Sequence, residues 1–200
     1  MIRTSLALLL ALGASGLEGV PLRFRPTDST AKVLNEASRV FKLDEVQVKP
    51  FTDAREDKQL IGRNHEEDPA RTVTTKDDVG AWCSTTLAGM LREAGIPVVD
   101  EGARYVISGK VTRFMVDEGG MYNGAVAMLV TVEDAKGKQL WTGLVTGASK
   151  RWGRSYKAEN YLEALSDALV RAVNALVTDP KLDGALEGGE RPASGTGLTL

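Results

Sequence analysis

The sequence is short of the side chains on which most catalytic and metal sites depend. Its 200 residues include one cysteine, Cys83, and one histidine, His65. A single cysteine excludes an internal disulfide, so the fold must be stabilised by its hydrophobic core. His65 precedes Glu66, Glu67 and Asp68, but this run lacks the ligand spacing of a metal site on a rigid element. We therefore interpret it as a solvated acidic loop and expect no metal and no cofactor.

An excess of positive charge is also missing. The 25 Lys and Arg residues are balanced by 27 Asp and Glu residues, and the formal net charge is −2. Nucleic-acid binding normally requires a basic patch or stripe, so we expect no nucleic-acid partner. Hydrophobic residues make up 42% of the sequence, which is enough for the core of one globular domain.

Long apolar runs are missing except near the start of the chain. Arg3 precedes an uninterrupted Leu/Ala run at 6–12, and small residues follow at 13–16. This order of charge, short apolar run and small residues is the layout of a secretory signal peptide. The run is too short for a stable transmembrane helix, which needs roughly 20 apolar residues. Residues 1–16 are therefore predicted to be a signal peptide. We expect the mature protein to be periplasmic or associated with the outer membrane, without a transmembrane span.

The end of this segment looks like a bacterial lipoprotein signal. In Leu12-Gly13-Ala14-Ser15-Gly16, a serine stands where lipid attachment requires a cysteine thiol. Ser15 cannot be acylated in this way, and Cys83 falls within a predicted helix. The sequence therefore leaves open whether the protein is anchored by a lipid.

Hydrophobic patterning divides the rest of the chain into three parts. Residues 17–43 are predicted to be an N-terminal segment of strand and linker, with a short strand at 20–25 and an ambiguous stretch at 29–42. Residues 44–180 are predicted to form the domain. Residues 181–200 are rich in Gly, Glu, Pro, Ser and Thr, and we expect them to be a disordered tail.

The domain is predicted to have an α+β fold. Amphipathic stripes mark two helices, the first with a capping-box-like start at Thr75, and short turns favour antiparallel pairing of the strands between them. We expect the order β-α-β-β-β-α, with a mostly antiparallel sheet of about four strands and both helices on one face. The predicted elements are a strand at 46–51, a polar connection at 52–78, a helix at 75–95, strands at 104–116, 126–132 and 139–149, and a helix at 158–177.

Few side chains remain as candidates for chemistry. Asp53, Glu56 and Asp57 could act as paired acid and base, but they share one exposed loop with Arg55. Paired catalytic carboxylates need different environments, so surface charge is the simpler interpretation. Cys83 could be a nucleophile, but no nearby base is indicated and its position on the apolar stripe favours a core residue.

Trp152 belongs to a basic aromatic cluster after the last predicted strand. Lys150, Arg151, Arg154 and Lys157 surround it in the sequence. Such a cluster could contact an anionic headgroup or a partner protein. The alternative is a loop that its aromatic side chains anchor to the fold.

Several motifs resemble the YajG-type uncharacterised bacterial lipoproteins. The strand "VQVKPF" is followed by "TDARED" and then "LIG", and "EAGIPV", "ARYVISGKVTRF" and "GKQLWTGLVTG" come later. The resemblance covers roughly residues 44–180 and extends more distantly to small α/β domains of envelope-assembly lipoproteins. It implies a non-enzymatic accessory protein of the cell envelope. Asp53, Arg55 and Gly62 would be its motif positions, without assigned chemistry.

Two roles stay open for Asp53 and Arg55. They could form a partly buried pair in which Arg55 also binds backbone carbonyls at the end of the sheet, or Arg55 could point outward to a partner. Gly62 nearby favours the first role, because a glycine suits a chain that turns tightly against a neighbour.

The sequence therefore favours a non-enzymatic accessory or binding protein of the cell envelope, with an unknown protein or lipid partner. The alternative is a periplasmic enzyme or a small-ligand carrier that uses the acidic loop 53–68. Convergence of Asp53, Glu56, Asp57 and His65 in a concave pocket would favour the enzyme.

Processing at the N-terminus tests the first of these inferences. We expect residues 1 to about 16 to be removed on export, because their layout is that of a signal peptide. N-terminal sequencing of the protein from the periplasm or membranes of its host measures this directly. An intact Met1 in those fractions would contradict the prediction.

Overall fold

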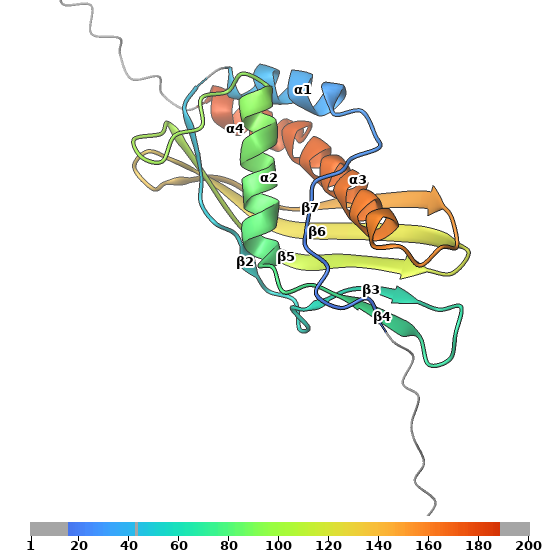
Figure 1. The fold of residues 1–200 in the computed structure, drawn as a ribbon. Helices are drawn as coiled ribbons and strands as arrows, with labels where there is room; N and C mark the ends of the chain where they lie inside the picture. The colour runs from blue at the N-terminus through green and yellow to red at the C-terminus, as the bar shows by residue number, and fades with distance from the viewer. Residues whose placement is uncertain (1–15, 43, 189–200) are drawn as a thin grey trace, which may run out of the picture.

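One long strand, β5, organises a sheet that is covered by helices on one face (Figure 1). The computed structural model describes residues 16–42 and 44–188. The helices are α1 (Ala31–Phe41), α2 (Val79–Glu93), α3 (Ala158–Val177) and α4 (Pro180–Glu187). The strands are β1 (Val46–Val48), β2 (Thr52–Asp53), β3 (Leu60–Asn64), β4 (Arg71–Thr74), β5 (Tyr105–Glu118), β6 (Met121–Asp134) and β7 (Gln139–Trp152).

The two edges of β5 have different partners. Along one edge, β6 pairs antiparallel with β5 over almost its whole length, and β7 pairs antiparallel with β6. Along the other edge, the short strands β1, β2 and β3 each run parallel to β5, one after another. β4 pairs antiparallel with β3. The result is a mixed sheet of 7 strands.

The α+β class is confirmed, but the predicted sheet of about four mostly antiparallel strands is wrong. The polar connection at 52–78 contains β2, β3 and β4, and three of the short strands are parallel to β5. These strands have two to five residues, which is too short for an alternating pattern to stand out. The predicted order β-α-β-β-β-α therefore misses three strands and two helices.

The N-terminal segment belongs to the packed structure. The stretch at 20–25 is not a strand, and the ambiguous stretch at 29–42 contains α1, which buries Val33, Ala37, Val40 and Phe41. Before it, the chain runs beside β4, where the Leu17 N–H donates to the Thr72 carbonyl at 3.0 Å. Residues 17–42 therefore contribute to the core instead of linking a signal peptide to it.

The expected disordered tail begins with a helix. The Asp179 side chain caps α4 by accepting from the N–H groups of Lys181 and Leu182. Leu182 and Leu186 of this helix are buried. Asp179-Pro180 follows the end of α3, and proline in the first turn after a capping aspartate is also a helix start. Residues 189–200 lie outside the described part of the chain.

The two predicted helices are confirmed as α2 and α3, with one change at the start of α2. Its cap is Asp78, whose side chain accepts from the Ala81 N–H at 3.0 Å. The Thr75 hydroxyl accepts instead from the Asp77 N–H, before the helix begins. None of the helices in the described ranges is long and apolar enough to cross a membrane.

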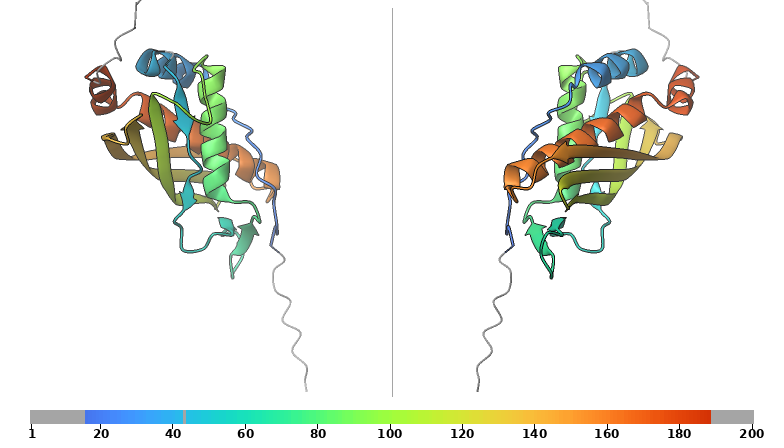
Figure 2. Two further views of the ribbon diagram at one scale, coloured as in Figure 1. Left: turned by 90° about the vertical axis from the view of Figure 1, so that its left-hand side faces the viewer. Right: turned by 90° about the vertical axis from the view of Figure 1, so that its right-hand side faces the viewer.

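α1, α2 and α3 lie on one side of the sheet, and α4 lies at its end beside β7 (Figure 2). α3 packs along β7 and β6, and α1 lies over both α2 and α3. Side chains alternate across β6: Tyr122, Val126 and Met128 are buried beneath the helices, whereas Leu129 on the opposite face is 42% exposed. The opposite face of β6 and β7 is therefore uncovered.

A glycine allows the close contact between α3 and β7. A Cβ atom at Gly147 would collide with the carbonyl oxygen of Ala168 and lie 2.5 Å from the Ala172 nitrogen. Both of those atoms belong to the backbone of α3, which cannot move away as a flexible side chain could. Position 147 therefore fixes how deeply the helix sits on the sheet.

This contact predicts opposite effects for two glycine substitutions. Gly147→Ala should lower the free energy of unfolding by about 2 kcal/mol or more, because it forces α3 away from β7. Gly89→Ala is the matched control, since nothing lies within 4 Å of a Cβ at this position in α2. Alanine there should raise stability by about 0.5–1 kcal/mol through helix propensity. Denaturant unfolding measures both; equal effects would contradict the packing account.

Candidate functional site

Asp53 and Arg55 form an ion pair beneath the protein surface. Only 7% of the Arg55 side chain and 8% of the Asp53 side chain are exposed. The contact is bidentate: Arg55 Nε donates to Asp53 Oδ1 at 2.9 Å, and Nη2 donates to Oδ2 at 2.8 Å. The Arg55 backbone N–H also donates to Oδ1. Arg55 therefore points into the fold and not outward to a partner.

The remaining donors of Arg55 bind backbone carbonyls. Nη1 donates to Leu60 at 2.7 Å and to Phe114 at 3.2 Å, and Nη2 donates to Lys58. The guanidinium group also lies over the Phe114 ring, 5.8 Å from its centroid. Every N–H donor of the guanidinium group thus has a partner. This is the first of the two roles that the sequence left open, a partly buried pair in which Arg55 also binds backbone carbonyls.

Arg55 lies beside a gap in the backbone pairing of β5. Along β5, pairing with β2 ends at Val111 and pairing with β3 begins at Val116. The Phe114 carbonyl lies in the gap between them and would otherwise lack a strand to bind. Arg55 supplies the missing donor, because a buried carbonyl without a partner is unfavourable.

The ion pair changes the protonation of Asp53. Its burial alone would raise the pKa of this carboxyl, but the hydrogen bonds and the positive charge of Arg55 outweigh burial and hold the pKa below its usual value. A carboxyl with a lowered pKa in the folded state stabilises the fold above its unfolded pKa. That stabilisation is lost as the pH falls through the folded pKa.

Gly62 leaves room for a buried tyrosine. A Cβ at this position in β3 would lie 2.5 Å from Cε1 of Tyr161, a residue of α3. Tyr161 is fully buried, and its hydroxyl donates to Glu118 Oε2 at 2.5 Å. The three motif positions Asp53, Arg55 and Gly62 are therefore all used within the fold.

The acidic loop does not bring its side chains together. Asp57 accepts from the N–H groups of Gln59 and Leu60, and Glu56 is exposed. His65 instead contacts Asp117 at the end of β5, with Nε2 3.0 Å from Oδ1. Within residues 16–42 and 44–188, no group of three or more His, Cys, Asp or Glu side chains could hold a metal ion.

Cys83, a residue of α2, is buried in the core, as its place on the apolar stripe predicted. Burial raises the pKa of its thiol well above the usual value, which keeps the thiol protonated and unreactive.

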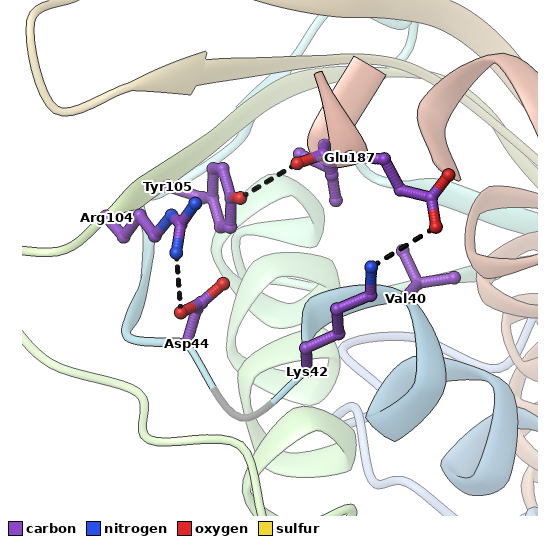
Figure 3. A pocket seen from close by; sticks show the side chains of 7 residues that line it. Val40, Lys42, Asp44, Arg104, Tyr105 and Glu187 are labelled. Carbon is purple, nitrogen blue, oxygen red and sulfur yellow. Dashed lines mark hydrogen bonds and ion pairs between the residues drawn. The ribbon is translucent and has the colours of Figure 1, made fainter. Parts of the chain in front are cut away.

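A polar cavity of about 240 Å³ opens elsewhere, between the end of α1, the start of β5 and α4 (Figure 3). Arg104 pairs with Asp44 at 3.0 Å, and Lys42 pairs with Glu187 at 3.2 Å. The charged groups of the lining therefore neutralise one another. The cavity is smaller than usual ligand pockets, which enclose about 300–1,000 Å³, and no residue of the acidic loop lines it.

Trp152 is the most exposed of the large hydrophobic side chains on the described surface, at 82%. It is the last residue of β7 and lies opposite Met121 in the hairpin with β6. Its basic neighbours are partly paired with acids: Arg154 contacts Glu66 at 3.6 Å, and Arg151 contacts Glu163. The acidic loop and the basic cluster, which the sequence kept apart, are thus neighbours.

A buried carboxylate beside this cluster was missed in the sequence. Glu118 is fully buried at the end of β5, where it accepts from the Tyr161 hydroxyl and from the Tyr156 N–H. The pattern of the strand could have found it, since Phe114, Val116 and Glu118 alternate on one face. Burial, followed by the hydrogen bond to Glu118, raises the pKa of Tyr161.

Solved structures are similar to this chain at low sequence identity. A Xanthomonas campestris protein of the DUF330 family is 13% identical with a TM-score of 0.53, over 72% of this chain and 87% of that one. A Caulobacter crescentus protein classed provisionally as a lipoprotein is 14% identical with a TM-score of 0.46, over 80% and 100%. A Neisseria meningitidis lipoprotein is 16% identical with a TM-score of 0.35, over 54% and 83%. No family model and no curated protein matches the sequence. The likeness to the first of these structures supports the fold alone.

The network around Arg55 predicts a loss of stability on conservative substitution. Arg55→Lys should lower the free energy of unfolding by about 2–3 kcal/mol, because an ammonium group cannot replace the planar set of donors. Arg104→Lys is the control: its pair with Asp44 is more exposed, and the change should be below about 1 kcal/mol. Denaturant unfolding at neutral pH measures both variants.

The same measurement at low pH tests Asp53. Asp53→Asn should be less stable than the natural sequence at neutral pH. The difference should shrink as the pH falls through the lowered pKa of Asp53 in the folded protein. A difference independent of pH would contradict the ion pair as its cause.

Proposed function

We propose that the protein is a non-enzymatic binding protein of the cell envelope that works through its surface. Its export is supported by the charge, apolar run and small residues at 1–16. Asp53, Arg55 and Gly62 all have partners within the fold, so these motif residues are not available to a partner. A binding surface therefore has to lie elsewhere on the molecule.

The uncovered face of β6 and β7 carries this proposal. Leu129 and Leu144 lie opposite each other in the pairing of the two strands, and they are 42% and 63% exposed. Exposed hydrophobic side chains that gather on one face are typical of interaction surfaces. Within β6 and β7 no charged side chain interrupts the central part of this face, although exposed Lys110 and Arg113 of β5 flank it opposite Leu129 and Ala127. We call this part the outer patch: Ala125, Ala127, Leu129, Thr131, Leu140, Thr142, Leu144, Thr146 and Ala148.

The outer patch suits a protein partner better than a solvent-facing role. Thr131 and Thr142 bond to each other at 3.1 Å through their hydroxyl groups, which leaves methyl groups and leucine side chains as the main contact area. β7 is also an edge strand, with β6 as its one strand neighbour in the described sheet. Edge strands offer backbone groups that a partner can bind.

Crosslinking in the native host tests this proposal. A photoreactive amino acid at position 144 should give a specific adduct with an envelope protein, because Leu144 lies at the centre of the outer patch. The matched control is position 181, where Lys181 is exposed on α4, on the helical side. Adducts at both positions, or at neither, would contradict a binding role for this face. Denaturing gels followed by mass spectrometry identify the products.

A further inference from the structure

Positive charge borders the outer patch along β5. Lys110 lies opposite Leu129 in the pairing of β5 with β6, and Leu129 lies opposite Leu144 in the pairing of β6 with β7. Neighbouring strands are about 4.8 Å apart, so these three residues form a row about 10 Å long across the sheet. Arg113 continues the border in the next row, opposite Ala127. Both cationic side chains are exposed.

A β-bulge places Arg113 on this face. The register of β5 against β6 shifts between Val111 and Arg113, and the consecutive residues Thr112 and Arg113 are both exposed. Val111 before them and Phe114 after them are buried on the helical face. With strict alternation from Lys110, residue 113 would point to the helical face instead. The backbone of β5 therefore builds the positive border.

Lys110 and Arg113 form no ion pair in the described part of the chain. Asp117 is bound to His65 at one end of the same face, and Glu133 lies near the other end, where β6 finishes. Each acid is four positions along the strands from the nearer cation, or about 13 Å. The positive charge beside the outer patch is therefore not neutralised, although the chain as a whole has a formal net charge of −2.

We propose that the partner of the outer patch is an acidic protein surface. Its apolar side chains would cover Leu129 and Leu144, and its carboxylates would lie along one side, where they meet Lys110 and Arg113. Charges arranged in this way select a partner and speed the encounter with it. The inference rests on the binding role proposed above and adds the chemistry of the partner.

The edge of β7 favours a polypeptide over a lipid surface. Arg171 Nη1 donates to the Ala148 carbonyl at 2.6 Å, so this carbonyl points away from β6. Backbone groups alternate in direction along an antiparallel strand, and those of Leu144 and Thr146 therefore point outward as well, at the border of the patch. A polypeptide can bind such groups, whereas lipid chains cannot.

A second copy of the chain lacks the required chemistry. In a two-fold dimer the same patch lies on both sides of the interface. The cations of one copy would then meet the outer patch of the other, which holds no carboxylate. The complementary acids therefore have to come from a different protein.

Charge reversal on β5 tests the inference. Crosslinking from position 144 is measured in the native host with Lys110→Glu and Arg113→Glu combined. We expect the yield of the protein adduct to fall roughly tenfold or more, because two favourable contacts become repulsive. The exchange of the two cations, Lys110→Arg with Arg113→Lys, keeps both charges and should keep the adduct.

The matched control reverses one lysine and one arginine on the helices that cover the other face. Lys32 of α1 and Arg92 of α2 are exposed. Lys32→Glu with Arg92→Glu makes the same change in net charge and should leave the yield unchanged. Circular dichroism shows whether each variant is folded. If the β5 reversal does not fold, Lys110→Gln with Arg113→Gln replaces it and should also lower the yield.

The outcomes separate this inference from the binding role itself. An adduct with an envelope protein that persists after charge reversal on β5 would overturn the acidic partner and leave the binding role intact. An adduct with lipid, or with a second copy of this chain, would also overturn the acidic partner. Absence of any adduct at position 144 in the natural sequence would overturn both proposals.

Discussion

The guanidinium group of Arg55 joins three strands at the point where backbone pairing along β5 is interrupted. It binds Asp53 in β2, the loop at Lys58, Leu60 in β3 and Phe114 in β5. β2 and β3 are short and parallel to β5, and they leave a gap between them that no backbone fills. The N–H donors of the side chain thus replace the backbone donors of a missing strand segment. It thereby reinforces the place of β3 against β5, on which β4 and then the N-terminal segment are built.

The sequence predicted the long elements and missed the short ones. α2, α3 and the strands β5 to β7 repeat their patterns often enough for the period to be seen, although β6 begins five residues before the predicted strand at 126–132. β2, β3 and β4 are too short to repeat a pattern. Their pairing is set by β5 and by Arg55 and not by local preference. α1 was left ambiguous and α4 was missed for a different reason: both depend on burial of a few apolar side chains, such as Phe41 and Leu182, against the rest of the fold.

The candidate site was likewise predicted only in part. The sequence singled out Asp53, Arg55, Gly62 and Trp152, but it could not identify what they contact. Three partners of Arg55 are backbone carbonyls, which every residue has and which no residue type therefore indicates. The neighbour of Gly62 is the ring of Tyr161, nearly one hundred residues away in the sequence. Burial of Glu118 could have been inferred from strand alternation, but its role depends on Tyr156 and Tyr161, which come from another element.

The contact between the N-terminal segment and β4 has a consequence for the order in which this end of the fold can form. Leu17 bonds with residues 72 and 74, but β4 rests on β3, and β3 rests on β5. The contact therefore needs the chain as far as residue 118, and the further bond from the Leu17 N–H to the Tyr156 hydroxyl needs residue 156. Residues near Gly16 have no folded neighbour until then, so a peptidase of the kind expected for an exported chain would reach them before they pack, because peptidases act on unfolded chain.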